Sequence, residues 1–206
     1  MKYIILDTET VDLHDDVIQM SFIVLDDKYK IMAFESFYCD TNKRVSDGAY
    51  SVHGLTNEFV HEQSGGKYLE DYLFNNPKYK ELFFDEEKVL LIGYNVDYDL
   101  TSINNTLMSK TGLTLPKISQ VVYPLNINGD GYFKYDLMTF YKNLTQKKYG
   151  YKLVDMVNSY LNEYDLDGIY KSLVKRFDLN VGENYHDAAF DTFCTLMLFY
   201  ECLKRV

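Results

Sequence analysis

Three short segments of the sequence carry residues whose types and spacing are suited to chemistry. The first is Asp7-Thr8-Glu9, which follows an apolar run at residues 3–6. On an extended chain, residues two apart point to the same side, so the carboxylates of Asp7 and Glu9 face one point. Two like charges on one face of a sheet repel each other unless a cation binds between them. The pair therefore indicates a cation site or, in its plainer interpretation, a solvated strand end.

The other two segments contribute two more carboxylates and a histidine. Asp99 follows a second apolar run at residues 89–92, and His186 and Asp191 lie where the last helix is expected to begin. Each acid alone is also typical of a helix N-terminus, where it caps the helix or interacts with its dipole. Together, four carboxylates and one imidazole form the set of groups that a two-metal phosphodiester hydrolase needs. Carboxylate oxygens favour Mg²⁺ or Mn²⁺ over zinc.

These segments resemble the motifs of the DnaQ-like, DEDDh-type 3′–5′ exonuclease family, which has a ribonuclease H-like fold. The D-x-E-T motif matches residues 7–10, and the second motif matches Asn95 and Asp99. The H-x-x-x-x-D motif matches His186 and Asp191. The resemblance therefore includes every metal ligand and the histidine of the family pattern.

Further similarities extend the resemblance over nearly the whole chain. Segments similar to the family are found at residues 52–56, 136–137 and 152–156. The chain departs from the family at Tyr94, where a histidine is more common, and at residues 11–12, where Thr-Gly is usual. Neither departure removes a metal ligand, so both concern substrate preference.

The resemblance implies a role for each matched residue. Two Mg²⁺ or Mn²⁺ ions would be held by the four carboxylates, which are Asp7, Glu9, Asp99 and Asp191. His186 would accept the proton of the attacking water as a general base, and the product would be a nucleoside 5′-monophosphate. The implied substrate contacts are Thr8, Thr10, Leu13, Val52, His53, Asn95 and Tyr98. Among these, Leu13 is the expected wedge on the terminal base, whereas Tyr98 either stacks on a base or packs in the core.

The expected function is metal-dependent hydrolysis of single-stranded nucleic acid from its 3′ end, with DNA as the favoured substrate. An RNA-trimming or oligoribonuclease-type exoribonuclease remains an alternative, because the metal site does not distinguish the two sugars. A proofreading or accessory subunit that docks on a DNA polymerase is another. An acidic calcium-binding protein is disfavoured, since the sequence has no D-x-[DN]-x-[DN]-G loop. The oligomeric state does not follow from the sequence.

An α/β domain with a mixed sheet near its N-terminus must position these residues. Apolar runs predict strands at residues 3–6 and 89–92, and an alternating pattern with Gln19 and Ser21 predicts one at residues 18–24. A further strand is predicted at residues 31–38 after a turn at 26–28. Short connections make the first three strands antiparallel. From residue 137 onward the apolar spacing is helical, whereas residues 112–135 are predicted to be irregular. The length fits a single ribonuclease H-like exonuclease domain over residues 1–206.

The composition narrows the classes of function. Asp and Glu outnumber Lys and Arg by 31 to 21, and the net charge of −10 argues against a protein that coats duplex DNA. Bound divalent cations can still supply positive charge at a scissile phosphate. The three cysteines form no C-x-x-C pair, which favours a reducing compartment. No secretory signal or membrane span is recognised, so we expect a cytoplasmic protein, and the abundance of Lys, Asn, Tyr and Ile favours a bacterial or phage source.

One stretch between the second and third motifs is rich in basic and aromatic residues, which are Lys142, Lys147, Lys148, Tyr149, Tyr151 and Lys152. The favoured interpretation is a solvated helix–loop–helix, because runs of charge are common on protein surfaces. The alternative is a guide that directs a single strand toward the metal ions.

Overall fold

The computed structural model describes residues 1–122, 125, 127–146, 149–181 and 186–205. Within this part of the chain, six strands form one mixed sheet in the order β3-β2-β1-β4-β6-β5. The strands are β1 (Lys2–Thr10), β2 (Val17–Leu25), β3 (Ile31–Tyr38), β4 (Lys88–Gly93), β5 (Ile118–Gln120) and β6 (Gly131–Asp136). The first three strands pair antiparallel, as the sequence predicts, and β1, β4, β6 and β5 pair parallel.

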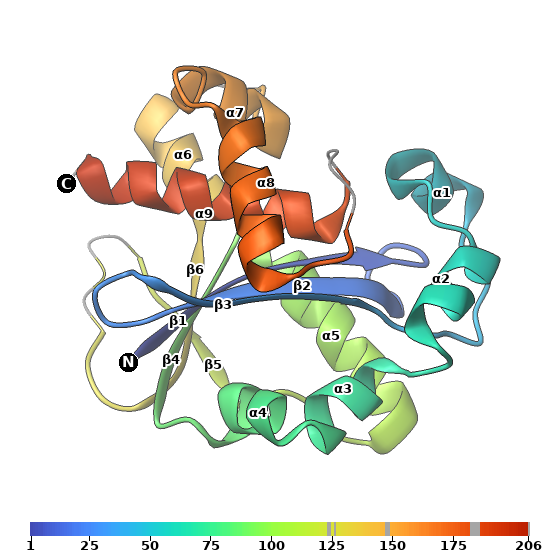
Figure 1. Cartoon of the computed structure of the whole chain (residues 1–206). Coiled ribbons are helices and arrows are strands. Elements are labelled where there is room, and N and C mark those ends of the chain that lie inside the picture. Colours follow the sequence, from blue (N-terminus) through green and yellow to red (C-terminus); the bar gives the residue numbers. More distant parts are fainter. Residues whose placement is uncertain (123–124, 126, 147–148, 182–185, 206) are drawn as a thin grey trace.

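Helices cover both faces of this sheet (Figure 1). They are α1 (Asp47–His53), α2 (Asn57–Ser64), α3 (Leu69–Asn75), α4 (Pro77–Lys80), a π-helical turn (Glu81–Asp85), α5 (Val96–Thr111), α6 (Leu137–Thr145), α7 (Leu153–Tyr160), α8 (Leu166–Phe177) and α9 (Ala188–Lys204). Helices α3, α4 and α5 lie against one face, and α6 to α9 lie over the other.

Strand β1 contributes side chains to both hydrophobic cores. Ile4 and Leu6 pack with α3 and α5, whereas Tyr3 and Ile5 pack with α6 and α9. The same alternation continues beyond residue 6, because β1 runs through Thr10. The sequence predicted that this strand would end near residue 6. Because the strand is longer, the acidic pair lies inside it rather than after it.

Two further sequence predictions require correction. Residues 112–135 are not uniformly irregular, because they contain β5 and most of β6. In β6 only Tyr132 and Tyr135 are buried, so the strand lacks the apolar run that marked β1 and β4.

Strand β2 also differs from the alternating strand that was expected. All nine of its residues are buried, including Gln19 and Ser21, because helices cover both faces.

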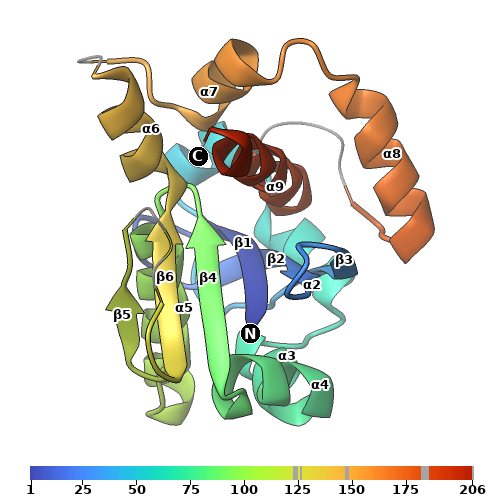
Figure 2. The same cartoon turned by 90° about the vertical axis from the view of Figure 1, so that its left-hand side faces the viewer.

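The parallel strands bring their C-terminal ends to one edge of the sheet. Figure 2 shows β4 and β6 side by side, both directed toward the end where α6, α7 and α9 lie. Ligands of α/β sheets generally bind at this edge. Over the described residues, no helix combines the length and apolar character needed to cross a membrane.

Candidate nuclease site

Two of the four predicted carboxylates come from the end of β1. Asp7 and Glu9 lie two residues apart on this strand, on the face that α9 covers. Between them, Thr8 points to the opposite face and meets α5. Its backbone N–H and its hydroxyl both donate to Oδ1 of Asp99, at 3.0 and 2.8 Å. Thr8 therefore holds Asp99 against the strand that carries the acidic pair.

The third carboxylate is positioned by the turn between β4 and α5. Asp99 lies in the first turn of α5, which begins at Val96, with two residues between it and the end of β4 at Gly93. Asn95 precedes the helix with φ of 71°, a left-handed conformation that asparagine tolerates. Its backbone N–H donates to Oδ1 of Asp136 at 2.8 Å. Asp136 also caps α6, so this turn and the start of α6 are fastened together.

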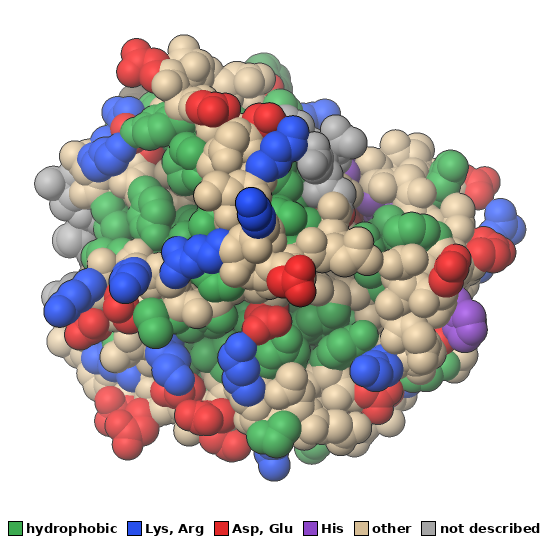
Figure 3. All heavy atoms as spheres, in the orientation of Figure 1, with side chains coloured by type: hydrophobic (Ala, Val, Ile, Leu, Met, Phe, Trp, Pro, Cys, Tyr) green, Lys and Arg blue, Asp and Glu red, His purple; other side chains and the backbone are tan. Residues whose placement is uncertain are grey.

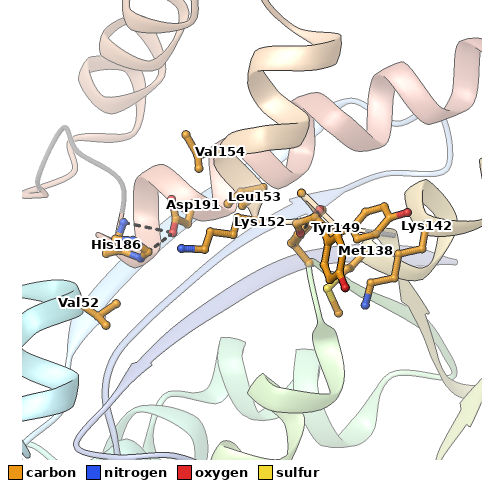
Figure 4. Close-up of a pocket in the computed structure, with 12 residues that line it drawn as sticks. Val52, Met138, Lys142, Tyr149, Lys152, Leu153, Val154, His186 and Asp191 are labelled. Atoms are coloured by element: carbon orange, nitrogen blue, oxygen red, sulfur yellow. Dashed lines mark hydrogen bonds and ion pairs between the residues drawn. The ribbon is translucent and has the colours of Figure 1, made fainter. Parts of the chain in front are cut away.

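The fourth carboxylate and the predicted histidine lie at the start of α9. Oδ2 of Asp191 accepts the backbone N–H of His186 at 3.2 Å. The Nδ1 atom of His186 lies 4.0 Å from the same oxygen, and its side chain is largely exposed (Figure 4). Glu9, His186 and Asp191 each present one ligand atom, and these atoms lie within 4.8 Å of one another. The structure thus brings together the residues of the first and third motifs.

Burial makes the charged forms of all four carboxylates costly. It raises the pKa of Asp7 and Glu9 well above the ordinary range, and repulsion from Asp191 and Asp99 adds to the effect. Burial also raises the pKa of Asp99 to about 7, against the effect of its bonds from Thr8. The pKa of Asp191 is likewise raised to about 7. Such a cluster is stabilised by protons or by cations.

One buried oxygen of the cluster tests whether a cation fits this site. Oδ1 of Asp191 is buried and has no hydrogen-bond partner among the residues that the structure describes, which is costly for a carboxylate oxygen. A hard divalent cation would satisfy this atom and relieve the repulsion among the four acids. The residues present therefore fit Mg²⁺ or Mn²⁺ by donor chemistry and by charge.

The predicted substrate contacts fall into two groups. Leu13 and Val52 are apolar and strongly exposed, at 78% and 52% of their surface. Thr10 instead makes bonds within the protein, since its hydroxyl lies 2.8 Å from the carbonyl of Asp12 and 2.6 Å from the hydroxyl of Tyr98. The ring of Tyr98 is half-buried beside His14, with ring centroids 4.9 Å apart. Tyr98 is therefore held rigidly at the end of β1.

Both ring nitrogens of His53 form hydrogen bonds with backbone groups. Nδ1 accepts the N–H of Leu55 at 3.0 Å, and Nε2 lies 3.1 Å from the carbonyl of Thr10, so Nε2 carries the proton. Burial lowers the pKa of this imidazole, which favours its neutral form. His53 thus fastens α1 to the end of β1, and its nitrogens are already engaged.

Sequence reasoning missed the residue that positions α9. Gln19 of β2 is fully buried, lies opposite Glu9 in the sheet and bonds to Asp187 and to the first turn of α9. The side chain of Asp187 caps α9. The only available signal was a polar residue in an apolar strand.

The lysine-rich stretch falls partly on Lys147 and Lys148, which lie outside the described residues.

Comparisons with known proteins extend the description of the fold. No family model and no curated protein matches the sequence. Among solved structures, exonuclease X in complex with 5′-overhanging duplex DNA has a TM-score of 0.57 and 17% identity, covering 98% of this chain and 92% of that chain. E. coli exonuclease I in complex with a dT13 oligonucleotide has a TM-score of 0.64 and 18% identity, covering 98% of this chain.

The ExoI/SSB-Ct complex is similar to the same degree, with a TM-score of 0.63, 17% identity and 99% of this chain covered. This chain spans 41% of the exonuclease I chain in these two structures. At sequence identities this low, the similarity shows that the chains share a fold and no more. The chain has the ribonuclease H-like α/β fold that the sequence predicts, and it shares this fold with exonucleases.

Proposed function

We propose that this chain is a metal-dependent 3′–5′ exonuclease of the DEDDh type, formed by one domain. It removes nucleoside 5′-monophosphates from single-stranded nucleic acid, with DNA as the favoured substrate. One observation carries the proposal: four carboxylates from β1, α5 and α9 converge, burial raises the pKa of each, and mutual repulsion adds to the rise at Asp7 and Glu9. The fold likeness to exonucleases crystallised with DNA supports the same assignment.

The four carboxylates would hold two Mg²⁺ or Mn²⁺ ions. When bound, such ions activate a water nucleophile and stabilise negative charge on the phosphate and the leaving oxygen. The protein fixes the ligands beforehand, since Thr8 orients Asp99 and the His186 N–H orients Asp191. A preorganised set of this kind loses little free energy to rearrangement when the substrate arrives.

His186 would accept the proton of the attacking water. Burial lowers the pKa of its imidazole below the ordinary 6.5, and the nearby charge of Lys152 lowers it further. The ring is therefore neutral at pH 7 and has a free electron pair for a proton. Its exposed position beside Asp191 leaves room for a substrate phosphate on the same side.

The terminal nucleotide would lie between the carboxylates and the exposed apolar side chains. Leu13 and Val52 would contact the base, and the rigid ring of Tyr98 would support it from the end of β1. Contacts of this kind depend on shape and stacking, so they tolerate any base.

The experiment is digestion of 5′-labelled single-stranded DNA and RNA side by side, with Mg²⁺ or EDTA. We expect Mg²⁺-dependent shortening of the DNA from its 3′ end in single-nucleotide steps, and no cleavage in EDTA. A 3′-phosphate should block the reaction because it fills the space of the terminal hydroxyl. Cleavage of a closed circular single strand, or cleavage of neither labelled polymer with Mg²⁺ or Mn²⁺, would contradict the proposal.

A further inference from the structure

A large groove begins at the catalytic carboxylates and continues past them. It has a volume of about 1180 Å³ and extends from Asp191 and His186 along α6 and the segment that leads into α7 (Figure 4). We call it the α6–α7 groove and define it by Tyr94, Met138, Lys142, Tyr149 and Lys152. Pockets that enclose one small ligand measure about 300–1,000 Å³. The α6–α7 groove therefore has room for more than a terminal nucleotide.

Its charge differs from that of the rest of the protein. The chain has a net charge of −10, and acidic and basic side chains are interspersed on the face shown in Figure 3. The described residues of the groove lining, in contrast, include two lysines and one carboxylate, Asp191. The amines of Lys142 and Lys152 form no ion pair with a carboxylate of the described residues. The groove is thus a locally basic path that begins at an acidic centre.

The two lysines lie at different distances from the carboxylates. In Figure 4, the amine of Lys152 is directed toward Asp191 and His186. Lys142 lies farther along, beside Met138 and Tyr149, and its amine is 5.7 Å from the ring centroid of Tyr151. A chain of phosphates that leaves the active site would meet the two positive charges in turn.

An aromatic surface lies between these charges. Tyr149 exposes 76% of its surface, although it lines a groove with mostly apolar walls. The segment that carries it is fastened to the sheet, since the hydroxyl of Tyr94 donates to the carbonyl of Tyr151 at 2.7 Å. An exposed ring on a fixed support is suited to base stacking, which every base can make through its flat face.

We propose that the α6–α7 groove binds the nucleotides on the 5′ side of the bond to be cleaved. Lys152 contacts the phosphate nearest the carboxylates, Tyr149 stacks on a base, and Lys142 contacts a phosphate farther along. The inference rests on the proposed function and narrows its substrate. It assigns the chain to strands of several nucleotides and disfavours a nuclease that is specialised for dinucleotides.

The test measures binding apart from cleavage. Fluorescence anisotropy is recorded with labelled oligothymidylates, from the dinucleotide to the dodecanucleotide, in Ca²⁺, with gel analysis to confirm that each probe stays intact. We expect affinity to rise with length in the wild-type protein. Tyr149→Ala should bind the longest probe about tenfold more weakly, because a stacked base contributes about 1–3 kcal/mol, while its dinucleotide affinity changes less than about twofold.

Matched variants separate the groove from general effects. Tyr149→Phe keeps the ring and should bind as the wild type does. Lys142→Gln should reduce the slope of log affinity against log salt by about 0.7, the value for one phosphate contact on a single strand. Lys175→Gln removes an exposed lysine of α8 outside the groove and should leave that slope unchanged.

The outcomes separate this inference from the proposed function. If the length dependence is the same in the wild type, Tyr149→Ala and Lys142→Gln, the groove does not bind the strand and the inference is overturned. Cleavage is measured separately with Mg²⁺. A wild-type protein that binds long strands through the groove but cleaves none would overturn the proposed function and leave the groove assignment standing.

Discussion

The side chain of Gln19 ties the sheet to the start of α9 through Asp187. The Nε2 atom of Gln19 donates to Oδ2 of Asp187 at 3.2 Å, and its Oε1 accepts the N–H of Ala188 at 3.2 Å. Gln19 lies opposite Glu9 in the β1–β2 ladder. One buried amide thus fixes the distance between a carboxylate on the sheet and the helix that carries Asp191.

Removal of this link should cost both stability and activity. Gln19→Ala removes the acceptor of the Ala188 N–H and one donor to Oδ2 of Asp187, at a cost of about 1–3 kcal/mol of unfolding free energy. Gln19→Glu should be at least as harmful, because two carboxylates then meet. Adding Asp187→Asn should restore stability and Mg²⁺-dependent activity, since the new amide donates to the new carboxylate. Urea denaturation and initial rates of cleavage test this. Equal losses of stability and activity in Gln19→Glu and in the double variant would contradict it.

Neutral replacements of the carboxylates should separate activity from stability. Asp7→Asn or Asp191→Asn should reduce Mg²⁺-dependent cleavage by orders of magnitude, because a ligand is lost from the proposed metal site. The same variants should unfold at an equal or higher temperature in EDTA, because repulsion within the acidic cluster is relieved. Thermal unfolding and digestion assays measure the two effects. Near-normal cleavage by either variant would remove that residue from the site.

The metal-free protein should lose stability as the pH rises from acidic to neutral. Asp99 and Asp191 have a folded-state pKa of about 7 against an ordinary 3.8, so the folded state binds their protons more tightly than the unfolded state does. Their contribution is fully present below about pH 4 and is lost as the pH rises through about 7.

Urea denaturation in EDTA, compared between the wild type and Asp191→Asn, tests this pH dependence. The decline in stability between about pH 4 and 7 should be smaller in the variant, because one proton-binding group is missing. Saturating Mg²⁺ should reduce the decline in the wild type, because cations replace the protons. Parallel curves for the two proteins in EDTA would argue that Asp191 does not titrate in this range.

His186 should affect the rate of chemistry more than binding. His186→Ala should cleave about 10²–10⁴-fold more slowly in single turnover, the usual cost of removing a general base. Wild-type rates should rise with pH through a pKa below 6.5, because burial and Lys152 favour the neutral ring. Mn²⁺ binding and single-strand affinity should stay close to wild type. If the wild type and His186→Ala gave superimposable pH–rate profiles with similar rates, His186 would have only a structural role.

The acidic pair was predictable because it depends on local geometry alone. Residues two apart on an extended chain share a face, and Asp7 and Glu9 do so because β1 continues through Thr10. The first three strands were also predictable, since apolar runs, alternation of apolar and polar residues, and short turns are local signals. The meeting of Glu9, His186 and Asp191 followed from three segments matching one family pattern, not from spacing along the chain.

The remaining features depend on contacts between distant parts of the chain. Gln19 was read as the polar side of an alternating strand, because the sequence does not reveal that helices cover both faces of β2. Strand β6 was missed because its burial is limited to Tyr132 and Tyr135. The direction of the Lys152 amine follows from how α7 is placed beside α9, which no local pattern encodes.

The position of α9 in the chain has a consequence for how the site comes into existence. Its carboxylate, Asp191, must meet Asp7 of β1, a strand formed from residues at the opposite end of the sequence. Contacts between such distant segments form slowly, because a long loop must first be closed. A chain whose last helix has not yet docked holds three of the four acids and lacks the proposed general base. If the proposed function is correct, the site is completed only when α9 docks, and a chain without docked α9 should not cleave nucleic acid.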